Sequence, residues 1–232
     1  MVDGIDGSGK GTIIEAWKEY LTNQGNAIFD LKQYWKEKNE YPELAEIKSY
    51  DFIFSCEPTR VGIGRVIREE LINADTHYQP RAIAEAYSLD RLILYTKIII
   101  PLLKDDKMII QDRGISSSLA YQTAQSPELT FSIIANLTGN ALAMEHRPDF
   151  LVLAESSPTI CATRLASRSS KKDNAIFETI PALEKTAAQF HSAEYQNIFT
   201  SRGTKILSLN TEDNIDIIRT KAVDLLKTII NQ

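Results

Sequence analysis

Cysteine is scarce in this chain, which has two, Cys56 and Cys161, among its 232 residues. Two cysteines build neither the disulfide framework of a small secreted domain nor a zinc site, so we expect a reduced, cytoplasmic protein. Long apolar runs are also lacking, because the longest, at 98–103, is too short to cross a bilayer and contains Pro101. We expect no signal peptide and no membrane partner.

The chain also lacks an excess of positive charge. It has 26 lysines and arginines against 31 aspartates and glutamates, a formal net charge of −5. This balance argues against a general binder of nucleic acids or anionic membranes, although it permits a local basic pocket. Internal repeats and low-complexity linkers are missing too. With 43% hydrophobic and 25% charged residues, 1–232 is expected to form a single globular domain.

Glycine is concentrated near the N-terminus, where residues 4–12 read Gly-Ile-Asp-Gly-Ser-Gly-Lys-Gly-Thr. Gly4, Gly9 and Lys10 have the G-x-x-x-x-G-K spacing of a phosphate-binding loop. Glycines let backbone N–H groups point at a polyphosphate, and the lysine adds a charge for its β- and γ-phosphates. A helix predicted at 12–21 directs its positive N-terminal end to the same anion. The residues expected to bind this polyphosphate are Gly7, Ser8, Gly9, Lys10, Gly11 and Thr12.

The hydroxyl residue of this motif stands one position late, at Thr12, because Gly11 follows the lysine. The resulting Gly-Lys-Gly-Thr resembles the form found in nucleoside monophosphate kinases such as adenylate kinase. In such a loop we expect Mg²⁺ to be held more through phosphates and water than by a loop hydroxyl. The alternative is a glycine-rich turn that arises by chance.

Strand-like and helical segments alternate along the whole chain. This alternation predicts an α/β fold, a three-layer sandwich in which helices flank a parallel five-stranded sheet. The strand-like segments are 1–3, 27–31, 50–55, 107–111, 150–154 and 205–209, and the helical ones are 12–21, 64–73, 81–104, 116–124, 127–145, 158–166, 176–199 and 214–230. The first strand is short, either because it is clipped or because upstream residues are missing. Residues 32–49 form a polar excursion with a short helix at 42–49, and residues 167–175 form a charged loop.

Polar segments follow three of the predicted strands. They are the loop at 4–12, Glu57-Pro58 and Asp112-Arg113. Ligands of parallel α/β sheets bind at the carboxyl ends of the strands, so we expect these segments to converge on one site.

Together these motifs resemble the thymidylate kinase family over essentially the whole chain. The matching pieces, in chain order, are 4–10, Cys56-Glu57-Pro58, 64–68, 87–91, 112–114 with 117–122, and 147–149. The resemblance implies transfer of the γ-phosphoryl group of ATP to dTMP, giving ADP and dTDP, with Mg²⁺ as cofactor. It also implies a homodimer, for which the long apolar helix at 81–104 could supply a face.

The resemblance further implies which residues act in phosphoryl transfer, a reaction that needs in-line positioning and neutralisation of charge. Asp112 would organise Mg²⁺, through water, and Arg113 would grip the acceptor phosphate or the group in transfer. Residues 167–175 match in position the family's lid over ATP. The catalytic residues expected on this basis are Lys10, Asp112, Arg113, Arg164 and Arg168.

A second implied set surrounds dTMP. Asp6 would accept a hydrogen bond from the sugar 3′-OH, Tyr87 would stack on the thymine ring, and Arg91 would reach its O4 edge. Tyr121 would lie under the deoxyribose and disfavour a 2′-OH. The remaining members, near the acceptor phosphate or the base edge, are Glu57, Arg60, Arg68, Arg113, Ser117 and Gln122.

Several of these residues have structural alternatives. Asp6 would also suit an ordinary turn, Tyr87 a packed core, and Asp112 with Arg113 a structural ion pair. Arg68 has the alternative of pairing with a neighbouring carboxylate. Ser117, Tyr121 and Gln122 have the alternative of helix surface or core.

Three departures from the family pattern bear on the acceptor. Cys56 stands where an arginine is usual, Gly114 replaces a tyrosine, and 32–49 is an added excursion. Another deoxynucleoside monophosphate or a deoxynucleoside therefore remains an alternative acceptor. A nucleotide-binding module that has lost catalysis is a further alternative.

Overall fold

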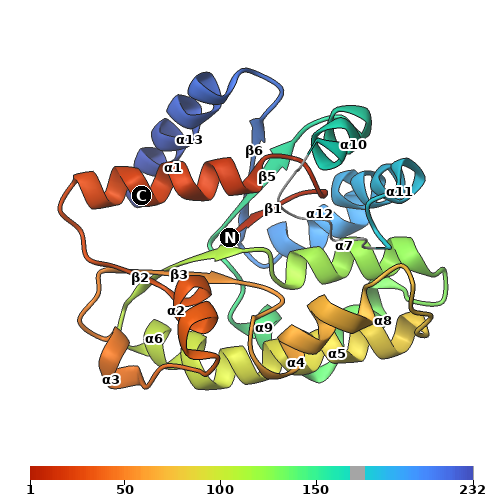
Figure 1. Cartoon of the computed structure of the whole chain (residues 1–232), viewed down its shortest axis with the longest axis horizontal. Coiled ribbons are helices and arrows are strands. Elements are labelled where there is room, and N and C mark those ends of the chain that lie inside the picture. Colours follow the sequence, from red (N-terminus) through yellow and green to blue (C-terminus); the bar gives the residue numbers. More distant parts are fainter. Residues whose placement is uncertain (168–175, 232) are drawn as a thin grey trace.

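The computed structural model describes residues 1–167 and 176–231, which form a parallel six-stranded sheet in the order β2-β3-β4-β1-β5-β6 (Figure 1). The sheet has six strands rather than the predicted five, because both edge segments pair over their full length, β2 with β3 and β6 with β5. The strands are β1 (Val2–Asp3), β2 (Ile28–Asp30), β3 (Phe52–Cys56), β4 (Met108–Asp112), β5 (Phe150–Glu155) and β6 (Lys205–Asn210).

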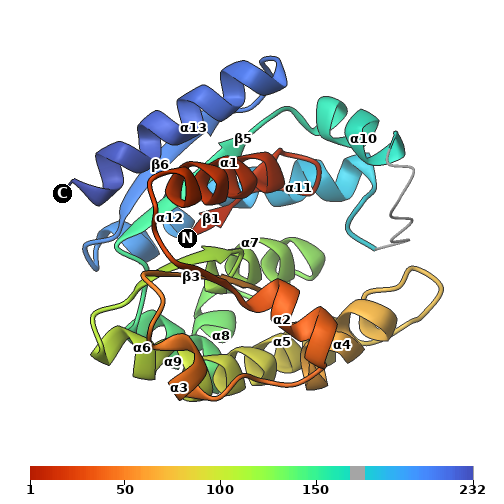
Figure 2. The same cartoon turned by 60° about the vertical axis from the view of Figure 1, so that its left-hand side comes forward.

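Helices cover both faces of this sheet (Figure 2). On one face, α1 (Lys10–Asn23) and α13 (Ile215–Ile230) pack together, and Trp17 Nε1 donates a 2.6 Å hydrogen bond to Ala222 O. Successive strand residues alternate between the two faces, so that Phe54 lies in the core beside α1 while Ile53 lies in the core on the other face. The three-layer α/β sandwich is therefore confirmed.

The second face is covered by helices from the middle and later parts of the chain. They are α5 (Pro80–Leu94), α7 (Ile115–Gln125), α8 (Phe131–Ala135), α9 (Thr138–Glu145), α11 (Ile180–His191) and α12 (Ala193–Thr200). Shorter segments complete the fold: α2 (Leu31–Lys38), α3 (Leu44–Ile47), α4 (Gly62–Val66), the π-helical turn η1 (Ile67–Leu71) and α10 (Pro158–Ala166).

The predicted helix at 81–104 is confirmed as one continuous run. It comprises α5, a π-helical turn η2 (Tyr95–Ile99) and α6 (Ile100–Lys104). Pro101 lies in the first turn of α6, directly after η2, where its missing N–H is better tolerated than in a regular helix interior.

Two other predicted helices are interrupted. The prediction for 127–145 is divided into α8 and α9, because Leu137 adopts an extended conformation. The helix predicted at 176–199 begins only at Ile180 and is divided into α11 and α12 at Ser192. Ser192 is also extended, and its Oγ accepts a hydrogen bond from Tyr195 N at 3.2 Å. A capping side chain such as Ser192 can start a new helix while the apolar residues keep their helical spacing, so the sequence pattern does not show the break.

The excursion at 32–49 is more ordered than predicted. Its first half forms α2, which begins after Asp30 because Asp30 Oδ1 accepts from the backbone N–H groups of Lys32 and Gln33 at 2.9 and 3.3 Å. Its second half contains the predicted short helix as α3. The predicted loop at 167–175 lies, apart from Ser167, outside the described residues. Among the described residues, no helix combines the length and apolarity needed to span a bilayer.

Helices α5 and α9 lie close together at Gly139, whose N–H donates to Ser88 Oγ at 2.9 Å. A Cβ at this position would lie 1.8 Å from Ser88 O. We expect Gly139→Ala to lower the free energy of unfolding by at least about 1–3 kcal/mol, because α5 and α9 must move apart to admit the added methyl group. Urea denaturation measures this change. Gly11→Ala is the control, since a Cβ there meets no atom within 4 Å, and it should be neutral or stabilising. Equal effects of the two substitutions would contradict the packing argument.

Candidate active site

The loop between β1 and α1 has a backbone path that requires glycine. Gly4 and Gly7 have φ values of 138° and 81°. Added Cβ atoms would lie 2.6 Å from Ala154 O and 2.5 Å from Cys161 O, respectively. Both conformation and space therefore fix these glycines, and the loop leads directly into the first turn of α1 at Lys10.

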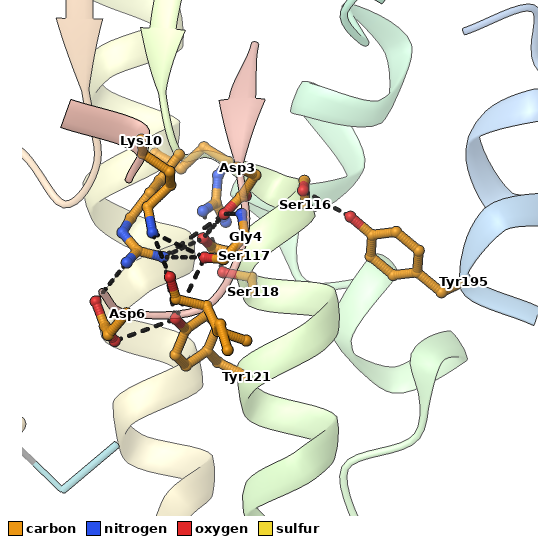
Figure 3. A network of polar contacts seen from close by, with 12 residues as sticks. Asp3, Gly4, Asp6, Lys10, Ser116, Ser117, Ser118, Tyr121 and Tyr195 are labelled. Carbon is orange, nitrogen blue, oxygen red and sulfur yellow. Dashed lines mark hydrogen bonds and ion pairs between the residues drawn. The ribbon is translucent and has the colours of Figure 1, made fainter. Parts of the chain in front are cut away.

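Lys10 is buried, and its ammonium group turns back onto the loop (Figure 3). Its Nζ donates to Gly4 O at 2.9 Å and to Ile5 O at 2.7 Å. Burial lowers the pKa of Lys10 to about 8, and the Arg113 guanidinium acts in the same direction. An anion that reached this ammonium group would compete with two neutral carbonyl groups and would stabilise its charged form.

Asp6, Arg113 and Tyr121 form a compact polar network beside Lys10. Arg113 Nη2 lies 2.5 Å from Asp6 Oδ1, and the Tyr121 hydroxyl donates to Asp6 Oδ2 at 3.1 Å. The Arg113 guanidinium also lies over the Tyr121 ring, with Cζ 5.2 Å from the ring centre. Arg113 adopts a φ of 65°, which is uncommon outside glycine and typical of residues held in place for function.

Asp3, at the end of β1, supports this network and was not predicted as a site residue. Its Oδ1 accepts from Gly4 N at 2.8 Å and from Ser117 Oγ at 2.7 Å (Figure 3). Arg113 Nη1 in turn donates to Ser117 Oγ at 3.1 Å. Burial raises the pKa of Asp3. The sequence does contain a signal for this role, because Asp3 is a carboxylate in a short predicted strand, 1–3, whose other residues are apolar.

Asp112 ends β4 next to this network. Its Oδ1 is buried and has no hydrogen-bond partner among the described residues. Buried carboxylate oxygens normally have a partner, so this oxygen fits a hydrated divalent cation. In the described part of the chain, no group of three or more histidine, cysteine or carboxylate side chains is placed to hold a metal ion. A metal at Asp112 would need further ligands from water or from a bound phosphate.

Glu57 and Arg91 form a buried ion pair just beyond the carboxyl end of β3, with Glu57 Oε2 and Arg91 Nη2 2.5 Å apart. Gln111 Nε2 also donates to Glu57 at 2.6 Å. The Arg91 guanidinium donates to Asn140 Oδ1 and, at 3.1 Å, to Ser118 Oγ. Burial raises the pKa of Glu57 to about 7, against the opposing effects of Arg91 and Gln111. Protein groups therefore occupy most of the Arg91 donors, leaving its Nε without a partner among the described residues.

The two arginines after Glu57-Pro58 differ in their contacts. Arg68 Nε donates to Pro58 O at 3.0 Å and to Thr59 O at 3.1 Å, so its described partners are backbone carbonyls rather than the carboxylate considered from the sequence. Arg60 Nε is buried without a partner in the described structure. Burial lowers the pKa of Arg60, and the neighbouring Arg68 adds to this shift.

These groups surround one cavity of about 280 Å³. Tyr87 is half-buried on α5, one helical turn before Arg91, and Gln122 is buried on α7 with its Oε1 unpartnered in the described structure. The predicted site residues that line the cavity are Asp6, Gly7, Lys10, Gly11, Glu57, Arg60, Arg68, Tyr87, Arg91, Asp112, Arg113, Ser117, Tyr121 and Gln122. Lys10, Arg113 and Tyr87, taken from three distant parts of the sequence, thus face the same space.

Residues 42–222 match the family model described as thymidylate kinase. The chain belongs to the thymidylate kinase family. Its members are nucleoside monophosphate kinases, a class of phosphotransferases.

Three curated relatives illustrate the similarity. The probable thymidylate kinase of Caldivirga maquilingensis is 27% identical over 167 residues, which cover 72% of this chain and 67% of that protein. That of Thermococcus onnurineus is 26% identical over 234 residues and 98% of both chains. The thymidylate kinase of Leptospira interrogans is 27% identical over 222 residues, covering 95% of this chain and 93% of the relative.

The other predicted site residues that the structure describes do not line the cavity but lie in or next to the loop at 4–12. Ser8 is buried, Gly9 precedes α1, and Thr12 is half-buried on α1. Arg164 Nη2 donates to Thr211 O at 2.6 Å and Nη1 to Gly7 O at 3.4 Å, which places its guanidinium behind the loop. Arg168 lies outside the described residues.

The departures from the thymidylate kinase pattern have structural counterparts. A Cβ at Gly114 would lie 2.4 Å from Met1 Cε, so a larger residue would displace the Met1 side chain. Cys56 is buried and contributes a neutral thiol to the cavity wall, where burial raises its pKa. Sequence reasoning missed several further residues of the wall, which come from unrelated parts of the chain: Lys32, Ser118, Phe177 and Glu178.

Proposed function

We propose that this protein transfers the γ-phosphoryl group of ATP to dTMP, giving dTDP and ADP. The observation that carries the proposal is the single cavity shared by Lys10, Arg113 and Tyr87. Phosphoryl transfer between two nucleotides requires their phosphates to meet end to end, and a cavity lined by both sets of residues provides that meeting point.

In this proposal the triphosphate of ATP lies on residues 7–12, and the Lys10 ammonium leaves the carbonyls of Gly4 and Ile5 to contact its phosphates. Arg164, held behind the loop, adds positive charge near the same phosphates. Bound Mg²⁺ would neutralise phosphate charge, with Asp112 orienting its water ligands. Arg168 stays a proposed contributor to catalysis on the strength of the family resemblance.

The acceptor occupies the other end of the cavity. Tyr87 stacks on the base, and Arg91, fixed by Glu57, presents its guanidinium group to the same ring. Asp6 accepts from the 3′-OH, while the Tyr121 ring lies under the sugar. Arg113 lies between the two halves and contacts the transferring phosphoryl group, where charge develops in the transition state. Gln122, whose buried Oε1 has no described partner, is the proposed contact for the base edge.

An acceptor panel tests this proposal. Purified protein with ATP and Mg²⁺ is offered dTMP, dUMP, dCMP, dGMP or thymidine, and formation of ADP and of the phosphorylated acceptor is measured. We expect dTMP to give the highest kcat/KM. The second candidate, another deoxynucleotide acceptor, is favoured by the neutral Cys56 thiol on the cavity wall, where the family pattern has an arginine. A higher kcat/KM for a different acceptor would replace the first proposal. Binding of ATP and dTMP without turnover would indicate a module that has lost catalysis.

The pH dependence of ATP use follows from Lys10. Its pKa of about 8 means that the ammonium form, which attracts phosphate, is progressively lost as the pH rises through that value. We therefore expect kcat/KM for ATP to fall between pH 7 and 9, since this parameter reports groups of the free enzyme. The kcat profile should fall only at higher pH, because bound phosphate stabilises the charged lysine. A kcat/KM that stays constant over this range would contradict the assignment.

We also propose a homodimer in a reducing, cytoplasmic setting. Leu89 and Leu103, on the continuous helix at 80–104, are 45% and 39% exposed and could form part of a face between subunits. The two cysteines are unpaired and buried, which supports a reducing compartment. The acidic net charge of −5 gives no reason to propose a nucleic-acid partner.

A further inference from the structure

The cavity wall beside Cys56 is rich in positive charge that comes from elements other than β3. Position 56 itself supplies a buried neutral thiol at the carboxyl end of that strand. Lys32, Arg60 and Arg68 all line the cavity together with this thiol. Burial has the largest effect and raises the pKa of Cys56, and the Asp112 carboxylate acts in the same direction, whereas the positive charges of Arg68, Lys32 and Arg60 oppose both. Three cations thus stand against the one carboxylate of Asp112. The part of the cavity next to Cys56 is therefore cationic.

Lys32 is held in this position by the start of α2. The Asp30 cap fixes the first turn of the helix, and Leu31 and Trp35 are buried beneath it. Asp30 is paired in register with Phe54 across β2 and β3. Lys32 and Cys56 each lie two residues beyond that pair, at the same edge of the sheet. The excursion at 32–49 thus places a lysine beside position 56, whose own side chain is uncharged.

None of these three cations has a carboxylate counter-ion among the described residues, and Arg68 alone has hydrogen-bond partners there, the backbone carbonyls of Pro58 and Thr59. Within residues 1–167 and 176–231, the side chains of Lys32 and Arg60 form neither an ion pair nor a hydrogen bond, although both are half-buried. Lys18, on the neighbouring helix, pairs instead with Asp30 at 2.6 Å. Positive groups that are partly desolvated and unpaired favour an anionic ligand, and two charges on one wall suit a phosphate dianion.

We infer that Lys32, together with Arg60, binds the phosphate of the acceptor nucleotide in place of a cation at position 56. Lys32 is on this basis a specificity-determining residue, because it makes the site prefer a nucleoside monophosphate over the corresponding nucleoside. The inference rests on the proposed function, and it assigns to helix α2 a direct part in substrate binding.

Calorimetric binding of dTMP and of thymidine separates the phosphate contribution from that of the base and sugar. Lys32→Met removes the charge and keeps the apolar stem, while Lys38→Met, an exposed position at the end of the same helix, is the matched control. We expect Lys32→Met to bind dTMP about 10- to 100-fold more weakly and thymidine unchanged. Lys38→Met should match the wild type for both, and Lys32→Arg should retain most of the affinity for dTMP.

Unchanged binding of dTMP by Lys32→Met would overturn the inference, as would an equal loss for dTMP and thymidine, which would indicate a general disturbance of the site. Steady-state kinetics give a second readout, in which KM for dTMP rises while KM for ATP is unaffected. Failure of the wild-type protein to bind any nucleoside monophosphate would contradict the proposed function itself. Normal wild-type binding with no effect at Lys32 would contradict only the role of Lys32.

Discussion

Lys10→Ala is expected to lower kcat for dTMP phosphorylation by about 100- to 1,000-fold, or about 2.7–4 kcal/mol of transition-state stabilisation. The ammonium group is the buried cation nearest the loop proposed for ATP, and it is 2.7 Å from the carbonyl oxygen of Ile5. Its replacement removes a positive charge that is proposed to contact the triphosphate while negative charge develops on the transferring phosphoryl group. Rapid-quench or coupled assays at saturating ATP and dTMP measure the effect.

The control for this substitution is Lys221→Ala on α13. Lys221 is exposed and forms a surface ion pair with Asp213, and its loss should leave kcat unchanged. Thermal unfolding of both variants would show whether the fold is retained. A folded Lys10→Ala protein with near-normal kcat would mean that residues 4–12 do not hold the phosphoryl donor.

Arg91→Ala is expected to lower the free energy of unfolding by about 3–5 kcal/mol, because it leaves the Glu57 carboxylate buried without its partner. The Arg91 side chain is 1% exposed and lies 2.5 Å from Glu57. The sequence alone suggests that this substitution mainly weakens acceptor affinity. The ion pair seen in the structure adds a loss of stability, so both should be measured, by urea denaturation and by dTMP binding.

Arg81→Ala provides the matched comparison on the same helix. Arg81 pairs with Glu85 one turn away, and both side chains are about half exposed. Such pairs contribute about 0.3–0.5 kcal/mol, so the two arginine variants should differ by several kcal/mol. If they are equally stable, the Glu57–Arg91 pair is not a buried determinant of the fold. If Arg91→Ala leaves dTMP affinity unchanged in the folded fraction, Arg91 does not contact the base.

The sequence predicted those parts of the molecule that local patterns encode. Alternating strand and helix segments gave the three-layer sandwich, and residues after the strands gave the convergence of Lys10, Glu57 and Asp112 on one cavity. The count of five strands was wrong because pairing at the sheet edges depends on register between distant segments. Whether each residue has its proposed role stays a prediction.

Other features could not be predicted because they depend on contacts between distant residues. Asn140 and Ser118 reach Arg91 from α9 and α7, and no local pattern marks either as a partner. Helix α2 was missed because its polar composition hides the cap that Asp30 provides. The division at Ser192 was missed because the apolar periodicity continues across it. For α2 and for the division at Ser192, a single side-chain cap decides where a helix begins.

The most direct test of the central claim is a crystal structure of the protein with dTMP, Mg²⁺ and a non-hydrolysable ATP analogue. The proposal predicts the triphosphate on residues 7–12 in contact with Lys10, the thymine beside Tyr87, and the two facing phosphates bridged by Arg113. A monophosphate bound outside this cavity, or oriented with its phosphate away from Lys10, would contradict it.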